Sequence, residues 1–259
     1  MEPLLINTEK GVRTITLNRP ERMNAINDDL SKQIEDAIAN ASADDDVRVV
    51  VITGNGRAFC SGLDLSKMPN TFGTRHEQLD ELGWVGRQAL GIVRCDKPVI
   101  AAINGMAAGA GLSLALACDL RFMSDQARVT TGYIRRGLNP DAGMSYFLPR
   151  LVGQGQATQM IFTGHDIDAD KAERTGLVNE TFSDETFHEQ VMAFAGDLAD
   201  GPPVALTFSK RLLSSNGEEE LSNLLKQEYA YIKRCFATDD VKEGIQAFLQ
   251  KRKPEFQGK

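Results

Sequence analysis

Lys97–Asp119, with the sequence KPVIAAINGMAAGAGLSLALACD, is the stretch on which the fold assignment depends. Its first part, 99–103, is a short apolar run after a proline and predicts a buried strand. After the glycines at 109 and 111, apolar residues continue to Ala117 and predict a helix that is buried on most sides. The first backbone N–H groups of such a helix have no partner within it, so they present a positive dipole end to whatever lies before them.

The glycines of this stretch do not by themselves identify a nucleotide site. GAGLSL lacks the third glycine of the dinucleotide fingerprint, and no clear ribose-binding acid follows at the usual distance. Glycine at a junction between a strand and a helix most often permits two backbones to approach closely. Taken alone, the stretch therefore favours tight packing over anion binding, and the remainder of the chain has to decide between them.

The composition of the 259-residue chain is that of an ordinary globular protein, with 42% hydrophobic and 25% charged residues. A formal net charge of −7 and a pI near 5.1 argue against binding to nucleic acid or to an anionic membrane, so we expect a small-molecule ligand. The first residues lack a basic segment followed by a long apolar run, and no later apolar run is long enough to span a bilayer. These features predict a cytoplasmic protein.

Cysteines and histidines are few and show no metal-binding spacing. No CxxC pair occurs, and the histidines form no metal-like pair with the cysteines, which predicts free thiols in a reducing compartment and no metal site. The residues concerned are Cys60, Cys95, Cys118, Cys235, His76, His165 and His188.

Upstream of the central stretch, the pattern predicts strands, turns and helices in alternation. Two strands at 4–6 and 12–17 flank a hairpin turn. Asn27 is a plausible N-cap for a helix through 41, and VRVVVIT at 47–53 predicts a buried strand. The polar segment 66–78 predicts a loop near a site. A helix is then expected from about His76 to Arg94.

Downstream, two short strands at 120–123 and 128–131 are expected. An apolar segment beginning at Tyr146 predicts a helix through Phe162, and a short helix and a last strand are expected at 170–175 and 177–182. From 184 onward the whole chain predicts helices, whose apolar faces need the core or another subunit to cover them. We expect a core at 1–200 and a helical region at 201–259.

Four separated motifs identify a family. They are NRPERMNAI at 18–26, AFCSGLDL at 58–65, KPVIAAINGMAAGAG at 97–111 and FATDDVKEGIQAFLQKRKPEF at 236–256. In this order and over nearly the whole chain, the sequence resembles the crotonase (enoyl-CoA hydratase/isomerase) superfamily. The resemblance implies an α/β crotonase (ClpP-like) spiral of ββα units with a C-terminal helical trimerisation region. It also implies homotrimers or dimers of trimers, acyl-CoA thioester substrates, and no cofactor beyond the coenzyme A of the substrate.

The resemblance also implies an oxyanion hole made by two backbone N–H groups, which stabilise negative charge on the thioester oxygen. By match to the motifs, the donors are Leu63 in the CSGLD turn and Ala110 in the GAG turn. The residues that it places around the coenzyme A and the acyl group are Ser61, Gly62, Asp64, Leu65 and Gly109. Asp64 by itself is better explained as a turn-capping carboxylate. Arg22 either faces the coenzyme A phosphates or is a solvated surface arginine.

Hydratases of this family use two glutamates to activate water, and here these positions hold Ser113 and Tyr133. Neither is a good base at neutral pH. A carboxylate occurs nearby at Asp141, in GLNPDAG, where composition alone favours a turn residue. In dienoyl-CoA and epoxyphenylacetyl-CoA isomerases, which this sequence resembles here, an Asp at this position transfers protons. Asp141 is therefore the candidate base, with Ser113 and Tyr133 shaping the pocket.

The resulting hypothesis is an acyl-CoA double-bond isomerase, because a single base suffices to move a proton within a dienolate. Two alternatives remain open: a hydratase with a rearranged water site, and an inactive paralogue that only binds acyl-CoA. The acidic composition argues against an RNA-binding relative. A dehalogenase of this superfamily also has an Asp here, but the His it needs corresponds to Gly86 and its Trp to Tyr133, which argues against dehalogenation.

Overall fold

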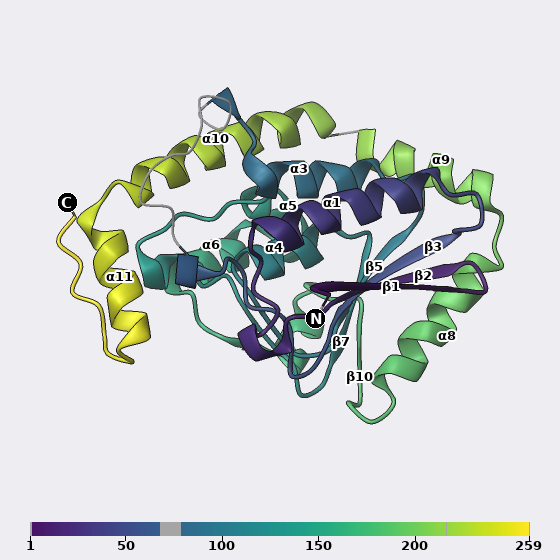
Figure 1. Ribbon diagram of the computed structural model, residues 1–259, viewed down its shortest axis with the longest axis horizontal. Coiled ribbons are helices and arrows are strands. Elements are labelled where there is room, and N and C mark those ends of the chain that lie inside the picture. Colours follow the sequence, from purple (N-terminus) through teal and green to yellow (C-terminus); the bar gives the residue numbers. More distant parts are fainter. Residues whose placement is uncertain (1, 68–78, 216, 259) are drawn as a thin grey trace.

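Between residues 49 and 130, successive strands alternate between two sheets. The computed structural model describes residues 2–67, 79–215 and 217–258 (Figure 1). A six-stranded sheet has the order β1-β2-β3-β5-β7-β10, and a four-stranded sheet has the order β4-β6-β8-β9. The strands are β1 (Leu4–Glu9), β2 (Val12–Leu17), β3 (Val49–Gly54), β4 (Ala58–Cys60), β5 (Val99–Ile103), β6 (Met106–Ala108), β7 (Leu120–Ser124), β8 (Arg128–Thr130), β9 (Ile167–Asp168) and β10 (Glu180–Phe182).

Helices follow the strand pairs and then make up the C-terminal part of the chain. Short 3₁₀ turns lie at η1 (Pro20–Arg22), η2 (Leu65–Lys67) and η3 (Ile134–Arg136). The α-helices are α1 (Asp28–Ala43), α3 (Gly83–Arg94), α4 (Ala110–Ala117), α5 (Met144–Val152), α6 (Gln154–Thr163), α7 (Ala169–Arg174), α8 (Phe187–Ala199), α9 (Pro203–Ser215), α10 (Glu218–Phe236) and α11 (Asp239–Leu249).

The repeating unit is one strand in each sheet followed by a helix. Strands β3, β5 and β7 are parallel neighbours in the large sheet, while β4, β6 and β8 are parallel neighbours in the small one. Parallel neighbours require a crossover, and α3 and α4 supply two of these. Each turn of this spiral therefore brings the loop after a small-sheet strand next to the corresponding loop of the preceding turn.

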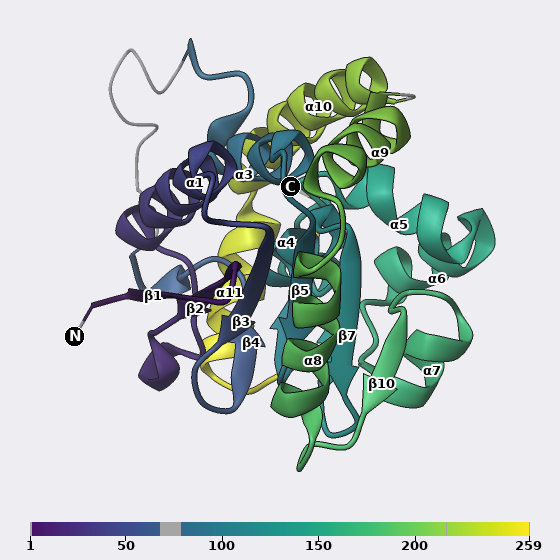
Figure 2. The ribbon, with the colours of Figure 1, turned by 90° about the vertical axis from the view of Figure 1, so that its right-hand side faces the viewer.

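The large sheet is covered on both faces, as Figure 2 shows. One face packs on α8 through Val191 and Ala195, and the other packs on α1, α3 and α4. Strands buried on both faces need apolar residues at nearly every position. This explains the uninterrupted apolar run of β3 and the complete burial of β5.

Most of the predicted elements are confirmed. The hairpin of β1 and β2 forms, and Asn27 caps α1 by accepting a hydrogen bond from Leu30 N–H at 2.9 Å. The α/β fold and the C-terminal run of helices are also as expected. Among the described residues, no helix combines the length and the apolar character needed to cross a membrane.

The predicted elements differ from the structure in four places. The helix expected from His76 begins at Gly83, because the Asp80 carboxylate binds the N–H groups of Leu82 and Gly83 and Gly83 has a φ of +64°. His76 itself lies outside the described residues, as does most of the loop predicted at 66–78. The single helix expected from Tyr146 to Phe162 is divided into α5 and α6 at Gly153.

The third difference is the pair of strands β4 and β6, which the sequence pattern had not separated from the neighbouring turns. Each has three residues, too few for an alternating pattern to be visible. The last strand is also shorter than expected, since β10 begins at Glu180.

The start of α4 lies against the end of β4 with no room for a side chain. A Cβ on Gly111 would lie 2.1 Å from the Cys60 carbonyl oxygen and 2.7 Å from its carbon. Both contacts are to backbone, so neither neighbour moves out of the way easily. The glycine at 111 is therefore required by close packing, as the sequence interpretation of the isolated stretch proposed.

We expect Gly111→Ala to destabilise the fold by about 1–3 kcal/mol or more, because the added methyl group overpacks the β4–α4 contact. Urea unfolding monitored by circular dichroism measures the change. The matched control is Gly91→Ala, since Gly91 is exposed within α3 and a Cβ there meets nothing within 4 Å. That variant is expected to be stabilised by up to about 1 kcal/mol through helix propensity. Equal effects of the two substitutions would contradict the packing argument.

Candidate active site

Two turns that are far apart in sequence meet at the start of α4. A Cβ on Gly62 would lie 2.8 Å from the Ala108 carbonyl oxygen and 3.4 Å from the Ala110 nitrogen. Gly62 has a φ of +93° and Gly109 a φ of +53°, so both turns use the left-handed region that glycine tolerates. The structure thus brings the two expected N–H donors, Leu63 and Ala110, to neighbouring positions.

Backbone hydrogen bonds with Ile26 hold the residues on either side of Leu63. Ile26 N–H donates to the Gly62 carbonyl at 2.7 Å, and Asp64 N–H donates to the Ile26 carbonyl at 2.9 Å. Leu63 lies between these two bonds. Ala110 is the first residue of α4, where N–H groups have no acceptor within the helix. Within the described ranges no acceptor is found for either N–H.

The loop at 18–26 holds the Leu63 turn in place. The buried Asn24 side chain donates to the Ala58 carbonyl at 2.7 Å and accepts from Arg19 N–H at 2.9 Å. Arg19 also forms an ion pair with Asp64 at 2.8 Å, in which both side chains are largely buried. The motif NRPERMNAI therefore has a physical function here, which is to fix the turn that carries one of the two donors.

Asp64 behaves as the turn-capping carboxylate that the sequence favoured. Its second oxygen accepts hydrogen bonds from the backbone N–H and the hydroxyl of Ser66. Burial raises the pKa of Asp64, but hydrogen bonds from Ser66 and Arg19 outweigh this and lower it to about 2. A carboxylate with such partners is a poor proton carrier at neutral pH.

The remaining expected coenzyme A contacts lie on this turn or next to it. Leu65 begins η2, and the Ser61 hydroxyl contacts the Arg22 carbonyl at 3.4 Å. Arg22 is exposed. Its contact with a phosphate remains a prediction.

Ser113, Tyr133 and Asp141 come from three different elements and form one hydrogen-bonded group. The Tyr133 hydroxyl donates to Asp141 Oδ1 at 2.5 Å and lies 3.3 Å from the Ser113 hydroxyl. The Ser113 hydroxyl in turn donates to the Asp141 backbone carbonyl at 3.0 Å. All three residues are buried. Ser113 and Tyr133, at the positions where hydratases have glutamates, therefore lie next to the candidate base. Asp141 is the only one of the three with a carboxyl group.

Burial controls the ionisation of this group. It raises the pKa of Asp141 to about 7, partly opposed by the Tyr133 hydrogen bond and reinforced by the charge of Glu228. Burial and the Asp141 charge raise the pKa of Tyr133 well above its ordinary value, so Tyr133 stays a neutral donor. Asp141 can therefore exchange a proton near neutral pH, which is the property of a general acid or base.

Apolar side chains surround the Asp141 turn. Val85, Ala110 and Ala142 form one buried cluster, and Trp84 and Tyr229 pack against it. This cluster links the Ala110 donor to the residue that follows Asp141, so the two N–H donors and the carboxyl belong to one contiguous region. A reacting group held there is shielded from bulk water, which strengthens hydrogen bonds to a developing charge.

Glu228 on α10 is a buried carboxylate that the sequence interpretation did not single out. Its oxygens accept hydrogen bonds from Gly143 N–H at 2.8 Å and from Ser145 N–H at 2.9 Å. A signal for it exists in the sequence, because Glu228 falls in the same stripe as the buried residues Leu221, Leu225 and Ile232. A glutamate in an apolar stripe indicates a buried polar partner.

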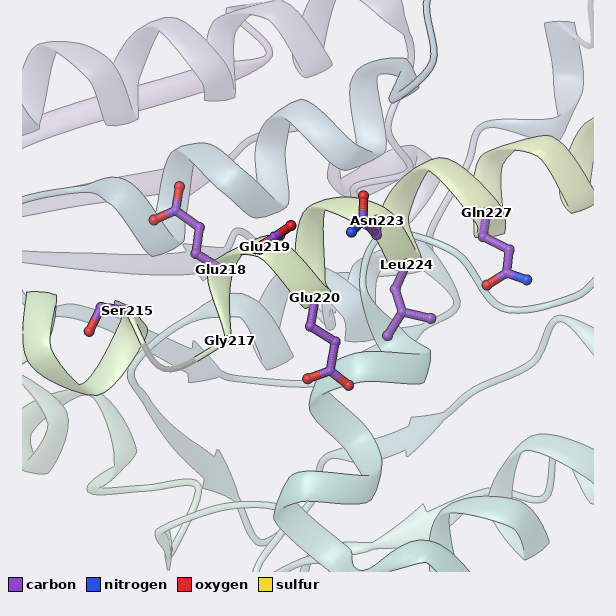
Figure 3. Close-up of a pocket in the computed structure, with 8 residues that line it drawn as sticks. All are labelled: Ser215, Gly217, Glu218, Glu219, Glu220, Asn223, Leu224 and Gln227. Carbon is purple, nitrogen blue, oxygen red and sulfur yellow. The ribbon is translucent and has the colours of Figure 1, made fainter.

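The surface of α10 next to α9 carries a hollow that contains none of these residues. It is lined by Ser215, Gly217, Glu218, Glu219, Glu220, Asn223, Leu224 and Gln227 (Figure 3). Acidic residues in the first turn of a helix are explained by the helix dipole, and Glu220 also pairs with Arg150. In the described part of the chain, no three His, Cys, Asp or Glu side chains are arranged to hold a metal ion.

Comparison with known proteins gives consistent results along the whole chain. A family model described as "Enoyl-CoA hydratase/isomerase" matches residues 7–259. The 1,2-epoxyphenylacetyl-CoA isomerase of Escherichia coli (strain K12) is 34% identical and the 2,3-dehydroadipyl-CoA hydratase of the same strain is 37% identical, each over 100% of both chains. A crystal structure of an enoyl-CoA hydratase from Mycobacterium avium subsp. paratuberculosis K-10 has a TM-score of 0.90 and 31% identity, and covers 99% of each chain.

The raised pKa of Asp141 predicts how stability depends on pH. Between its ordinary value of 3.8 and about 7, the folded state binds a proton that the unfolded state has released. Wild-type stability relative to Asp141→Asn should therefore decrease as the pH rises through this window. The decrease is about 1.4 kcal/mol for each pH unit at most. Urea unfolding of both proteins at pH 5 and pH 8 measures the difference.

Asp64→Asn is the control for this measurement. Because the pKa of Asp64 is lowered to about 2, its contribution is complete above pH 4 and is lost only in acid. The stability difference between wild type and Asp64→Asn should thus be the same at pH 5 and pH 8. A flat difference for Asp141→Asn as well would show that Asp141 ionises normally.

Proposed function

The chain belongs to the enoyl-CoA hydratase/isomerase family, and within that family we propose that it is an isomerase that moves a double bond in the acyl group of an enoyl-CoA. The observation that carries this proposal is the state of Asp141. It is the one carboxyl among Ser113, Tyr133 and Asp141, it is buried, and its pKa is raised to about 7. A base that also works as an acid at neutral pH needs such a pKa.

In the proposed reaction, ionised Asp141 removes a proton from the carbon next to the thioester carbonyl of a 3-enoyl-CoA. The electron pair of the broken C–H bond forms a double bond between carbons 1 and 2, and the π pair of the carbonyl moves to the thioester oxygen, which gives a dienolate. Asp141 then returns the proton to carbon 4. When carbon 4 is protonated, the carbonyl re-forms, the pair between carbons 1 and 2 becomes the new double bond between carbons 2 and 3, and the pair of the old double bond binds the proton. Substrate and product have the same composition, so no co-reactant is required.

Leu63 and Ala110 supply the two N–H donors for the thioester oxygen in this proposal. Both N–H groups lack an acceptor within the described residues and belong to turns in direct contact, which supports a preorganised pair. Donors that need no rearrangement are worth about 2.7–4 kcal/mol each in comparable sites. Tyr133 holds the Asp141 carboxyl in one orientation, and Ser113 fixes the Asp141 backbone.

Hydration is the second candidate, because hydratases are also among the relatives. Addition of water requires groups that both hold the water and move its protons. Glu228, the other buried carboxylate of the described residues, already accepts hydrogen bonds at both oxygens from the α5 turn. Among the described residues, Asp141 thus has no second carboxylate with which to share a water molecule, which favours a proton shuttle over hydration.

Exposed apolar side chains on α9 support the expected assembly into a homotrimer or a dimer of trimers. Phe208, Leu212 and Leu213 are 55%, 70% and 82% exposed. A group of large apolar side chains on one helix is costly in water unless another surface covers it. A second copy of the chain is the proposed partner of this face, as in the family that the sequence resembles.

We expect Asp141→Asn to lose at least about a hundredfold in isomerisation of a 3-enoyl-CoA, because the amide cannot carry the proton. Its affinity for a non-reactive acyl-CoA, measured by calorimetry, should stay close to wild type. For the wild-type enzyme, kcat/KM should rise with pH through about 7 as Asp141 ionises.

Product analysis separates the alternatives. Wild-type turnover by Asp141→Asn would overturn the proposed base. Hydration of crotonyl-CoA faster than isomerisation would identify a hydratase, and tight ester binding without turnover of any ester in a panel would identify an inactive paralogue.

We expect the double variant Leu212→Glu/Leu213→Glu to dissociate toward the 28.4 kDa monomer, since two charges would be placed in the proposed interface. Sedimentation velocity at micromolar concentration measures the size, and circular dichroism checks that the fold is retained. A monomeric wild-type protein under the same conditions would contradict the assembly.

A further inference from the structure

We propose that Glu228 of α10 is a positioning residue for Asp141, which holds the 141–145 turn in place and sets a second carboxylate charge behind the proposed base. The catalytic meaning of this inference rests on the proposed function. The interaction between the two buried carboxyl groups, through one turn, does not depend on that function.

Among the described residues, the hydrogen bonds of the Glu228 carboxylate are all with the turn that follows Asp141. Oε2 accepts from Gly143 N–H at 2.8 Å, while Oε1 accepts from Ser145 N–H at 2.9 Å and from the Ser145 hydroxyl. Gly143 is the N-cap of α5, so these are two of the N–H groups that the helix leaves without partners. A carboxylate from another helix thus takes the place of the local capping side chain that α5 lacks.

The turn needs this support because its backbone is strained. Ala142 has a φ of +57° and Gly143 a φ of +81°. An alanine in the left-handed region is unfavourable, because its Cβ lies too close to the following carbonyl oxygen. The Asp141 carbonyl accepts both Met144 N–H and the Ser113 hydroxyl, which fixes one end of the turn. Glu228 fixes the other end, so the Asp141 side chain has little freedom to leave Tyr133.

The donors around Glu228 favour its ionised form. Burial raises the pKa of Glu228 above its ordinary value, and hydrogen bonds from Ser145 and Gly143 oppose part of this rise. Both oxygens accept a backbone N–H, and a protonated carboxyl could accept well at only one of them. The negative charge of Glu228 raises the pKa of Asp141, because two like charges in a buried region disfavour ionisation of the second.

Three cations on α10 and α5 have partners of their own among the described residues. On α10, Lys226 pairs with Glu81, and Lys233 lies over the Tyr229 ring and donates to the Asp80 carbonyl. On α5, Arg150 pairs with Glu220. In the described part of the chain, the groups whose pKa is raised by the charge of Glu228 are Asp141 and the Tyr133 hydroxyl bonded to it.

The placement of Glu228 on α10 argues against an incidental surface residue. It is 5% exposed and lies with Leu221, Leu225 and Ile232 on the buried side of the helix. Glu219, Glu220 and Gln227 lie on the other side, around the hollow in Figure 3. A leucine at 228 would continue the apolar stripe, so a glutamate there is explained by what it binds.

The test measures the ionisation of Asp141 directly, without turnover. Protein labelled with ¹³C at the aspartate carboxyl carbons is titrated by NMR, and the Asp141 signal is assigned by its absence in Asp141→Asn. In Glu228→Gln, which keeps the shape but removes the charge, the titration midpoint of Asp141 should fall by on the order of one pH unit. An unchanged midpoint in this variant would overturn the inference.

Ser145→Ala is the matched control, because it removes the hydroxyl contact to Glu228 and keeps the charge. Its Asp141 midpoint should remain close to wild type. If it falls as far as in Glu228→Gln, loosening of the turn explains the shift and the charge does not.

Glu228→Asp keeps the charge but moves it back by one methylene group. This variant tests the positioning role if Glu228→Gln does not fold. We expect a lower kcat with an Asp141 midpoint still near that of wild type. Wild-type kcat in this variant would overturn the positioning role. A lower midpoint in Glu228→Gln together with full activity of Asp141→Asn would support the interaction and contradict only the proposed function.

Discussion

The close backbone contact between the end of β4 and the start of α4 is the constraint on which the site depends. Gly111 lies directly against the Cys60 carbonyl, and Gly62 lies against Ala108 and the Ala110 nitrogen. No side chain fits between these segments. Because strands in successive turns of the spiral are parallel neighbours, the loops that follow them meet at one edge. This packing of backbone on backbone places the N–H groups of Leu63 and Ala110 together. The side chains of these two residues are not what brings them together.

Burial gives the same region its chemical character. The apolar cluster of Val85, Ala110 and Ala142 excludes water from the Asp141 turn, and the pKa of Asp141 rises as a result. The Tyr133 hydroxyl partly offsets that rise while it orients the carboxyl. The proposed proton transfer therefore uses a carboxyl whose ionisation is unfavourable in the folded protein. The stability that the protein loses when this carboxyl ionises is a consequence of the proposed function.

The sequence predicted that three side chains of the site lie together, but it did not predict Glu228, the strands β4 and β6, or the start of α3. Separated motifs were enough to bring Ser113, Tyr133 and Asp141 into one group, and the structure joins all three by hydrogen bonds. Glu228 was missed because it lies 87 residues beyond Asp141, and its place in an apolar stripe indicates a buried polar partner without indicating which segment that partner belongs to. Short strands such as β4 and β6 were missed because their pairing depends on partners distant in sequence. The start of α3 at Gly83 depends on the local contacts of Asp80, which override an apolar pattern that continues upstream.

The central claim is that one buried carboxyl moves a proton within the substrate. Transfer of an isotopic label within the substrate tests this claim most directly. A 3-enoyl-CoA deuterated at carbon 2 is converted in ordinary water, and the position of deuterium in the product is read by NMR and mass spectrometry. The account predicts deuterium at carbon 4 of a 2-enoyl-CoA of unchanged composition, in a fraction that reflects how well the site excludes water. A product that has gained a water molecule, or turnover with no deuterium ever reaching carbon 4, would contradict it.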